Sequence, residues 1–165
     1  MEALVPDLLV PLYKLPPLEP VIKDLADKGI IIRRSNTFEL TPISEFITEH
    51  FSRQWSDENA AALSRQPASS FIAVDDGRVI GFGTYESTRR AYFGPTGVAL
   101  SHRGQGIGTG LLLACLHGLQ DLGYAYGIIG SAGPVDFYCK TVHAIVIPDS
   151  EPGIYTNLLK KPAKE

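Results

Sequence analysis

The chain has 165 residues, of which 44% are hydrophobic and 20% are charged, and its formal net charge is −3. This length and apolar content favour one compact domain with its own core and exclude a disordered chain. The lack of a basic excess argues against nucleic acid as an obligate partner, because few cations are left to neutralise phosphates.

The first 17 residues are predicted to form an extended arm. Four prolines interrupt its apolar run: Pro6, Pro11, Pro16 and Pro17. No basic segment precedes that run, so the arm is expected to be neither a signal peptide nor a membrane span. Its leucines and Tyr13 are too apolar for a free tail. The arm is therefore expected to pack on its own domain or, alternatively, on a second subunit in a homodimer.

A short helix and a first strand are predicted next. Pro20 stands at an early helical position, and Gly29 ends the helix. The apolar run Ile30–Ile32 then predicts a strand. Residues 1–29 are thus expected to form an N-terminal arm and short helix that pack on a single domain of residues 30–165.

Two further helices are predicted before residue 68. Thr41 is expected to cap the first helix, with Pro42 in its first turn, because a hydroxyl at the cap accepts a free backbone N–H. Ser56 is expected to begin the second helix, since acidic residues that complement the helix dipole follow it directly. Pro67 ends that helix, because the residue before a proline avoids helical backbone angles.

Three antiparallel strands are predicted in the middle of the chain. The runs Ser70–Val74 and Val79–Glu86 flank the turn sequence Asp-Asp-Gly-Arg, which indicates a hairpin. The third strand is Tyr92–Leu100, and Pro95 and Gly97 interrupt its ladder of hydrogen bonds. A bulge or a local opening of the sheet is expected there.

A glycine-rich turn connects the third of these strands to a long helix. The segment Ser101–Gly110 has glycine at every second position from Gly104, and the helical pattern after it ends at Gly123. Because a helix N-terminus presents free N–H groups and partial positive charge, the turn is predicted to bind a phosphate or pyrophosphate. Gly118 and Gly110 lie inside the helix, where glycine is unfavourable unless another group approaches closely.

The rest of the chain is predicted to contain short strands and one helix. Tyr126–Gly130 and Ala144–Ile147 are expected strands, Pro134–Lys140 is expected to begin a short helix, and Ile154–Leu159 is expected to form a short last strand. The order of all these elements predicts a mixed sheet with helices on its faces.

The two cysteines indicate a reducing compartment. Cys115 and Cys139 both fall in predicted helices without the spacing of metal ligands, and two cysteines make no disulfide framework. We therefore expect free thiols, a cytoplasmic protein and no bound metal.

Three phosphate-binding motifs compete for the glycine-rich turn. A P-loop requires a lysine after its glycines, and a dinucleotide fingerprint requires a third glycine at a spacing that the chain lacks. Arg103, Gly106 and Gly108 instead fit the pattern Arg/Gln-x-x-Gly-x-Gly/Ala. This pattern resembles the signature of the GCN5-related N-acetyltransferases, the GNAT superfamily. The alternative is a tight turn that serves only close packing of helix and sheet.

The resemblance extends well beyond the turn. Residues 30–148 follow the order of elements in the GNAT superfamily, and Asp136–Lys140 resembles a later helix that typically contains Phe-Tyr-x-Lys. One loop motif alone would be weak evidence, and the combination carries the prediction. It implies an α/β (α+β) fold with a mixed, mostly antiparallel central sheet that splays between two parallel strands and has helices on both faces.

The resemblance implies acetyl-CoA as the co-substrate. Its pantetheine arm would enter the gap between the parallel strands and bond to the backbone of Val98 and Leu100, and its pyrophosphate would lie on N–H groups of the turn. Arg103 would either add a charge-assisted bond or pack its stem across the loop. The implied cofactor-binding residues are Val98, Ala99, Leu100, Arg103, Gly104, Gln105, Gly106, Ile107, Gly108 and Thr109.

The implied reaction is direct transfer of the acetyl group to a primary amine of a small molecule or peptide. Tyr138 matches the family's tyrosine that protonates the departing thiolate; the alternative is a core aromatic beside Phe137. The strand glutamate that many relatives use as a base is missing, and Glu86 is the nearest carboxylate in the sheet. The other candidates for the base are His50, Asp57, His102 and a water chain.

The acceptor amine is not identified by the sequence. Ser131 stands in the loop where many relatives have an asparagine, either as a polar contact or as loop filler. Six aromatic residues can form a pocket rim or ordinary core: Phe51, Trp55, Tyr85, Tyr92, Phe93 and Tyr155. Two other functions stay open, a non-catalytic acyl-CoA-binding sensor or scaffold and an interaction protein that uses the apolar arm.

Overall fold

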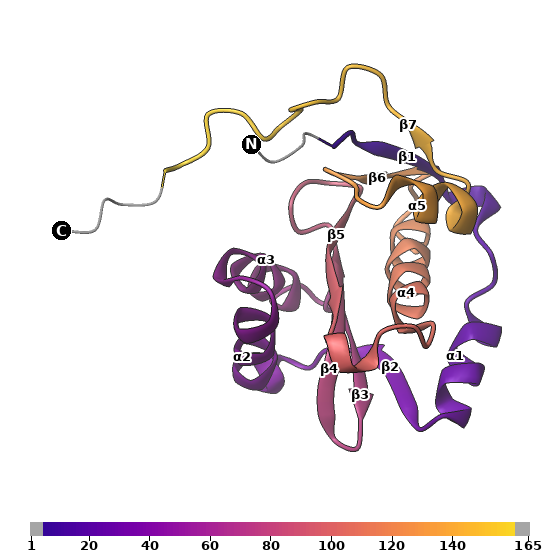
Figure 1. Ribbon diagram of the computed structural model, residues 1–165, viewed down its shortest axis with the longest axis vertical. Coiled ribbons are helices and arrows are strands. Elements are labelled where there is room, and N and C mark those ends of the chain that lie inside the picture. Colours follow the sequence, from indigo (N-terminus) through magenta and orange to yellow (C-terminus); the bar gives the residue numbers. More distant parts are fainter. Residues whose placement is uncertain (1–4, 161–165) are drawn as a thin grey trace.

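A seven-stranded sheet with the order β2-β3-β4-β5-β6-β1-β7 forms the centre of the protein (Figure 1). The computed structural model describes residues 5–160, so the ends of the predicted arm and domain, 1–4 and 161–165, lie outside the described residues. The strands are β1 (Leu8–Pro11), β2 (Ile30–Arg34), β3 (Ser70–Asp75), β4 (Arg78–Tyr85), β5 (Tyr92–Val98), β6 (Tyr126–Ile129) and β7 (Ile145–Val146). All neighbouring strands are antiparallel except β5 and β6, which form the expected parallel pair.

Helices cover both faces of this sheet. Over the described part of the chain they are α1 (Glu19–Asp27), α2 (Leu40–His50), α3 (Arg53–Leu63), α4 (Ile107–Asp121) and α5 (Val135–Val142). The pair α2 and α3 lies on one face, and α1 and α4 lie on the other (Figure 1). Most residues of α4 are themselves apolar and buried, around nearly its whole circumference, as expected for a helix enclosed between a sheet and other helices. The predicted fold class is therefore confirmed.

Close packing explains the two glycines inside α4. A Cβ on Gly118 would lie 2.6 Å from the ring of Tyr85, and a Cβ on Gly110 would lie 2.5 Å from Ile32 Cδ1. Any larger residue at either position would push the sheet or α1 away from α4. The predicted close approach is confirmed at both glycines.

The sheet opens between β5 and β6. Among the described residues, these strands pair only through Tyr92 and Phe93 of β5, and the β4–β5 register shifts beside the same stretch. Beyond Phe93, β5 bonds to β4 alone. Gly97 lets β5 run beneath the ring of Phe51, because a Cβ at this position would overlap that ring. The expected bulge and the expected opening are both present.

The N-terminal arm contains a strand that the sequence analysis did not predict. β1 lies between β6 and β7 and is antiparallel to both, with Leu8 opposite Ile129 on one side and Val146 on the other. Leu8 and Val10 are fully buried. Pro11 is tolerated because it lies beyond the short pairing with β7, where β1 has a free edge. The described part of the arm therefore packs within the sheet of its own chain.

The predicted start of α3 is wrong. Ser52, rather than Ser56, caps the helix, because its hydroxyl oxygen accepts the backbone N–H of Trp55 at 3.1 Å. Ser56 is buried inside α3, and its hydroxyl donates to the Ser44 carbonyl of α2 at 3.4 Å. Both serines satisfy the local rule for a cap, and tertiary packing selects the earlier one.

The predicted cap of α2 and the predicted last strand are also wrong. Thr41 lies inside α2, which follows a 3-10 turn in which Asn36 and Glu39 cap each other's backbone N–H groups. No strand forms over Ile154–Leu159. The position beside β6 is occupied by β1, so the chain after β7 has no strand edge there to join.

Neither cysteine is oxidised in the structure. Cys115 and Cys139 are both free, and burial raises the pKa of the Cys115 thiol, which keeps it protonated and unreactive. Of the helices within residues 5–160, none is long and apolar enough to span a bilayer.

Removal of the Glu39 carboxylate is expected to destabilise the fold in a pH-dependent way. Arg33 donates to this carboxylate from both terminal guanidinium nitrogens, Nη1 at 2.8 Å and Nη2, and mainly these bonds lower the pKa of Glu39 to about 2. A carboxyl whose pKa is lowered by folding stabilises the protein above its unfolded pKa of about 4.3 and loses that contribution as the pH falls toward 2. Urea unfolding should show Glu39→Gln less stable at pH 7 by at most about 1 kcal/mol, because the pair is partly exposed.

The control for this prediction is Asp27→Asn, which removes the exposed ion pair between Lys23 and Asp27. This control should change the free energy of unfolding little at either pH. A cost of Glu39→Gln that stays the same from pH 7 down to pH 2 would show that the ion pair with Arg33 does not stabilise the fold.

Candidate active site

The glycine-rich turn connects β5 to α4 through a short 3-10 turn, Leu100–His102. Gly106, the residue before α4, has φ +86°, a left-handed conformation that costs glycine little. The N–H of Gly110 donates to the Gly106 carbonyl at 3.1 Å. The N–H groups of the three residues between them precede this bond and have no partner within the helix. The turn therefore presents N–H donors and the positive end of a 15-residue helix.

Residues of this turn line a cavity of about 330 Å³, here called the cofactor cavity. Its lining consists of Val98, His102, Arg103, Gly104, Gly106, Ile107, Gly108, Thr109 and Phe137. All of these except His102 and Phe137 belong to the set that the sequence analysis predicted. Three predicted residues do not line the cavity: Ala99, which is buried, Leu100, whose side chain is 77% exposed, and Gln105.

The backbone of β5 has an unpaired edge beside the cofactor cavity. Because the Ala99 N–H donates to Ile80 of β4 at 2.8 Å, the alternation of the strand turns the backbone of Val98 toward the opening. The Nε of Arg103 donates to the Val98 carbonyl at 3.1 Å. The arginine therefore packs across the loop, which is one of the two roles expected for it. Leu100 lies in the 3-10 turn after the strand, so the expected edge contact from its backbone stays a prediction.

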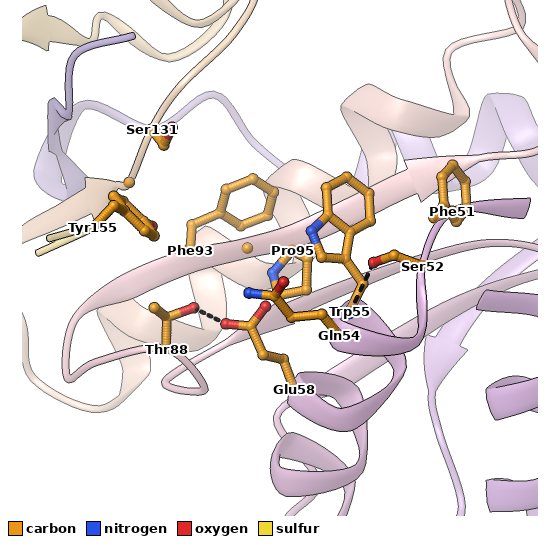
Figure 2. Close-up of a pocket in the computed structure, with 12 residues that line it drawn as sticks. Phe51, Ser52, Gln54, Trp55, Glu58, Thr88, Phe93, Pro95, Ser131 and Tyr155 are labelled. Carbon is orange, nitrogen blue, oxygen red and sulfur yellow. Dashed lines mark hydrogen bonds between the residues drawn. The ribbon is translucent and has the colours of Figure 1, made fainter. Parts of the chain in front are cut away.

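A larger cavity of about 630 Å³, here called the acceptor cavity, borders the other end of the same opening (Figure 2). Its lining consists of Phe51, Ser52, Gln54, Trp55, Glu58, Thr88, Phe93, Gly94, Pro95, Gly130, Ser131 and Tyr155. The walls thus come from the α2–α3 junction, α3, the β4–β5 loop, β5, the loop after β6 and the segment after β7. Gly94 and Pro95 lie where β5 has separated from β6, so the two cavities share the unpaired part of β5.

Glu58 is the carboxylate of the acceptor cavity, and the sequence analysis did not assign it to a site. It reaches from α3 toward the Pro95 stretch of β5, and its Oε1 accepts the Thr88 hydroxyl at 2.7 Å (Figure 2). The Ser87 hydroxyl donates to the Glu58 backbone carbonyl and so ties the β4–β5 loop to the same helix. Trp55 and Glu58 stand three residues apart in α3 and so share one face of that helix, which was the available signal, and Phe51 lies just before the helix.

Tyr138 is buried behind the opening. Its side chain is 7% exposed and packs edge-on against Phe93, with ring centroids 6.4 Å apart, while its neighbour Phe137 lines the cofactor cavity. Burial raises the pKa of the Tyr138 hydroxyl, which therefore carries its proton at neutral pH. Tyr138 itself belongs to the lining of neither cavity.

Glu86 is not brought to either cavity. It is buried, its Oε1 accepts the Ala91 N–H, and Arg65 lies 3.9 Å from its other oxygen. The carboxylate thus closes the β4–β5 loop from a residue with φ +59°. Of the other candidate bases, His102 lines the cofactor cavity, where Asp75 holds its Nε2 at 3.1 Å. His50 and Asp57 are exposed and line neither cavity.

A family model described as the acetyltransferase (GNAT) family matches residues 35–132, more than half of the chain. The chain belongs to the GNAT acetyltransferase family. The matched range contains the whole glycine-rich turn and most of the residues that line the two cavities. The family that this model describes is one of acetyltransferases.

Solved structures of GNAT proteins share this fold. The glucosamine N-acetyltransferase region of a fungal multi-domain GH3 β-N-acetylglucosaminidase is 18% identical with a TM-score of 0.71, over 89% of this chain and 20% of that one. A GCN5-related N-acetyltransferase from Sphaerobacter thermophilus is 19% identical with a TM-score of 0.61, over 88% and 50%. An acetyltransferase from Colwellia psychrerythraea is 18% identical with a TM-score of 0.60, over 86% and 53%.

This GNAT chain spans between about a fifth and about a half of the length of those three proteins. At 18–19% identity the similarity shows the fold alone. No curated protein sequence matches the chain.

Proposed function

We propose that this GNAT protein is an acetyl-CoA-dependent N-acetyltransferase that moves the acetyl group directly to a primary amine of a small molecule or peptide. The observation that carries the proposal is the position of the two cavities on one unpaired stretch of β5. One cavity has the anion-binding turn, and the other has a carboxylate and aromatic walls. A thioester lying along this stretch would have its acetyl group between the cofactor side and the acceptor side.

The residues of the turn have distinct roles in this proposal. N–H groups at the start of α4 bind the pyrophosphate, and Phe137 and His102 close the sides of the cofactor cavity. The Val98 N–H, which faces the opening, donates to the oxygen on which negative charge develops during transfer. Tyr138 supplies the proton that the departing thiolate requires, and the side chain of Phe93 lies between it and the acceptor cavity.

Several parts of the proposal rest on sequence alone. A cytoplasmic location, a reaction without a metal and a homodimer remain predictions of this kind. The division into an N-terminal part, 1–29, and a domain, 30–165, is likewise a proposal. Side chains of β1 and α1 in the N-terminal part pack in the same hydrophobic clusters as those of the domain.

A non-catalytic acyl-CoA-binding module is the second candidate function. The observation that favours it is that neither Tyr138 nor Glu86 lines a cavity. Such a module would be stabilised by acetyl-CoA but would release no CoA with any amine.

The two candidates are separated by measuring acetyl-CoA binding and CoA release on the same protein. For an enzyme, Tyr138→Phe should slow CoA release with an amine by about 10²-fold or more, because a general acid contributes about that factor. It should leave the thermal stabilisation by acetyl-CoA unchanged, since Tyr138 does not line the cofactor cavity. Glucosamine is one amine to include, because the similar fungal region is named for it.

Tyr126→Phe is the matched control for this experiment. Tyr126 is exposed on β6 and pairs with Tyr13, away from both cavities, so its loss should change neither measurement. CoA release by Tyr138→Phe at the rate of the unmodified protein would remove Tyr138 from the mechanism. Binding of acetyl-CoA without CoA release with any amine would favour the non-catalytic candidate.

A further inference from the structure

We infer that the acceptor cavity selects a cationic amine that carries no carboxylate or phosphate group, with its ammonium bound at Glu58. This inference rests on the proposed function for the name of the cavity, and it adds the chemical class of the acceptor. Two properties of the cavity lining carry it, its negative charge and its aromatic surface. A site that binds an acidic ligand would instead be expected to have cationic side chains.

The formal charge of the acceptor cavity lining is negative. Within residues 5–160, Glu58 is the sole formally charged residue in this lining, to which no lysine, arginine or histidine of that range belongs. The nearby cation Arg89 is exposed and donates to the Thr88 carbonyl, outside the lining. A ligand carboxylate or phosphate would therefore be desolvated here beside a like charge and without a cationic partner.

A second buried carboxylate lies directly behind the loop after β6. Asp7 is 6% exposed, and its Oδ1 accepts the backbone N–H of Ser131, which lines the cavity, at 2.7 Å. Burial, together with the negative charges of Asp7 and Glu58, raises the pKa of Tyr155 to about 12. The Tyr155 hydroxyl at the cavity wall therefore stays neutral, and the second carboxylate, that of Asp7, lies behind the wall that Ser131 forms.

Glu58 has an oxygen left for a ligand. Its Oε1 accepts the Thr88 hydroxyl, whereas no protein donor lies on its Oε2 among the described residues. A carboxylate oriented by one neutral donor keeps its charge available, and a charge-assisted bond to an ammonium is stronger than a neutral one. The ammonium of the acceptor would hold that oxygen before its proton is removed.

Aromatic surfaces complete the selectivity. The rings of Phe51 and Trp55 lie 5.4 Å apart and tilted by 31°, and Phe93 and Tyr155 stand farther along the wall (Figure 2). Such faces attract a cation through the ring quadrupole and pack well against a ring of the ligand. They repel the charge of an anion. Ser52, Gln54 and Ser131 add neutral polar groups that can bond to hydroxyls of a ligand.

The test compares matched amines with and without an acidic group. Tyramine is compared with tyrosine, and glucosamine with glucosamine 6-phosphate. Binding of each amine is measured by calorimetric titration of the CoA-loaded protein, and transfer to it by the CoA released from acetyl-CoA. The acid-free member of at least one pair should bind at least about tenfold more tightly. Since binding is measured without transfer, loss of activity alone would count against the proposed enzyme and not against this inference.

Glu58→Gln identifies the group that reads the charge. It should weaken binding of the acid-free amine by about tenfold or more and reduce the preference within the pair, because a bond to a charged group is lost. Asp57→Asn is the matched control, an exposed carboxylate on the same helix outside the cavity, and it should change nothing. Stabilisation by acetyl-CoA should persist in both variants and report an intact fold.

Three outcomes would overturn the inference. They are equal or tighter binding of the acidic member of both pairs, binding of none of the four amines, and a Glu58→Gln variant that binds like the unmodified protein. The first would point to Arg89 as a cation that moves into the acceptor cavity. The second would mean that this cavity is not where an amine binds.

Discussion

Gly108→Glu is expected to abolish acetyl-CoA binding while the protein stays folded. Gly108 is the second residue of α4 and lines the cofactor cavity, and a Cβ there would meet only Val98 Cγ2 at 3.9 Å. The added carboxylate would occupy the anion site with a like charge. It would also complement the helix dipole, so the free energy of unfolding should stay level or rise by up to about 1 kcal/mol.

The measurement is thermal unfolding with and without acetyl-CoA. A ligand at about 100 times its dissociation constant stabilises the unmodified protein by about 2.7 kcal/mol, which raises the melting temperature by several degrees. Gly108→Glu should show no such rise. Gly108→Ala is the control, because the family signature admits alanine at this position and the Cβ has room. A full rise in Gly108→Glu would place acetyl-CoA elsewhere and leave the turn as a packing device.

The elements around the glycine-rich turn were predictable because their signals are local. The third strand, the glycine-rich turn and α4 are consecutive, and each follows from rules that span a few residues. Pro95 and Gly97 marked the opening of the sheet for the same reason, since both weaken the ladder within one strand. Arg103 was left with two roles, and only the fold shows that its guanidinium bonds to the Val98 carbonyl.

The N-terminal strand was missed because nothing close in sequence indicates it. Its partners β6 and β7 lie near the other end of the chain, and the run of four residues ends in a proline and follows another one closely. Short apolar runs of this kind do not distinguish a strand from an apolar arm. The choice was decided by the free edge of β6, which a sequence pattern does not record.

The acceptor side was predicted least well because it is assembled from distant segments. Glu58 was interpreted only as a charge near the start of a helix, although it shares a face of α3 with Trp55 and lines the same cavity as Phe51. Glu86 was considered because it ends a strand, but the loop after it returns the Ala91 N–H to its carboxylate. Glu86, at the end of a strand, is thus bonded by a residue close to it in the sequence. The Glu58 carboxylate, on the helix, is bonded instead by Thr88, which is far from it in the sequence.

Leu8→Ala is expected to destabilise the protein by about 2–5 kcal/mol, the usual cost of a cavity left by a buried leucine. Leu8 is fully buried at the start of β1, between Ile129 of β6 and Val146 of β7, in the same cluster as Tyr138 of α5. Chemical unfolding measures the cost. Leu9→Ala, a partly exposed position on the other face of the same strand, is the control and should cost less.

This prediction also concerns the site, because β1 lines neither cavity but the residue before it holds a loop at the wall of the acceptor cavity. Asp7, the residue before β1, holds the Ser131 N–H, whereas Ile107, at the end of the glycine-rich turn, packs on β4 and α1. Below its unfolding transition, Leu8→Ala should therefore keep the stabilisation by acetyl-CoA and weaken amine binding. If Leu8→Ala cost no more than Leu9→Ala, β1 would not be anchored in the core. The strand from the N-terminus would then be a cover on the sheet, and the shape of the acceptor cavity would not depend on it.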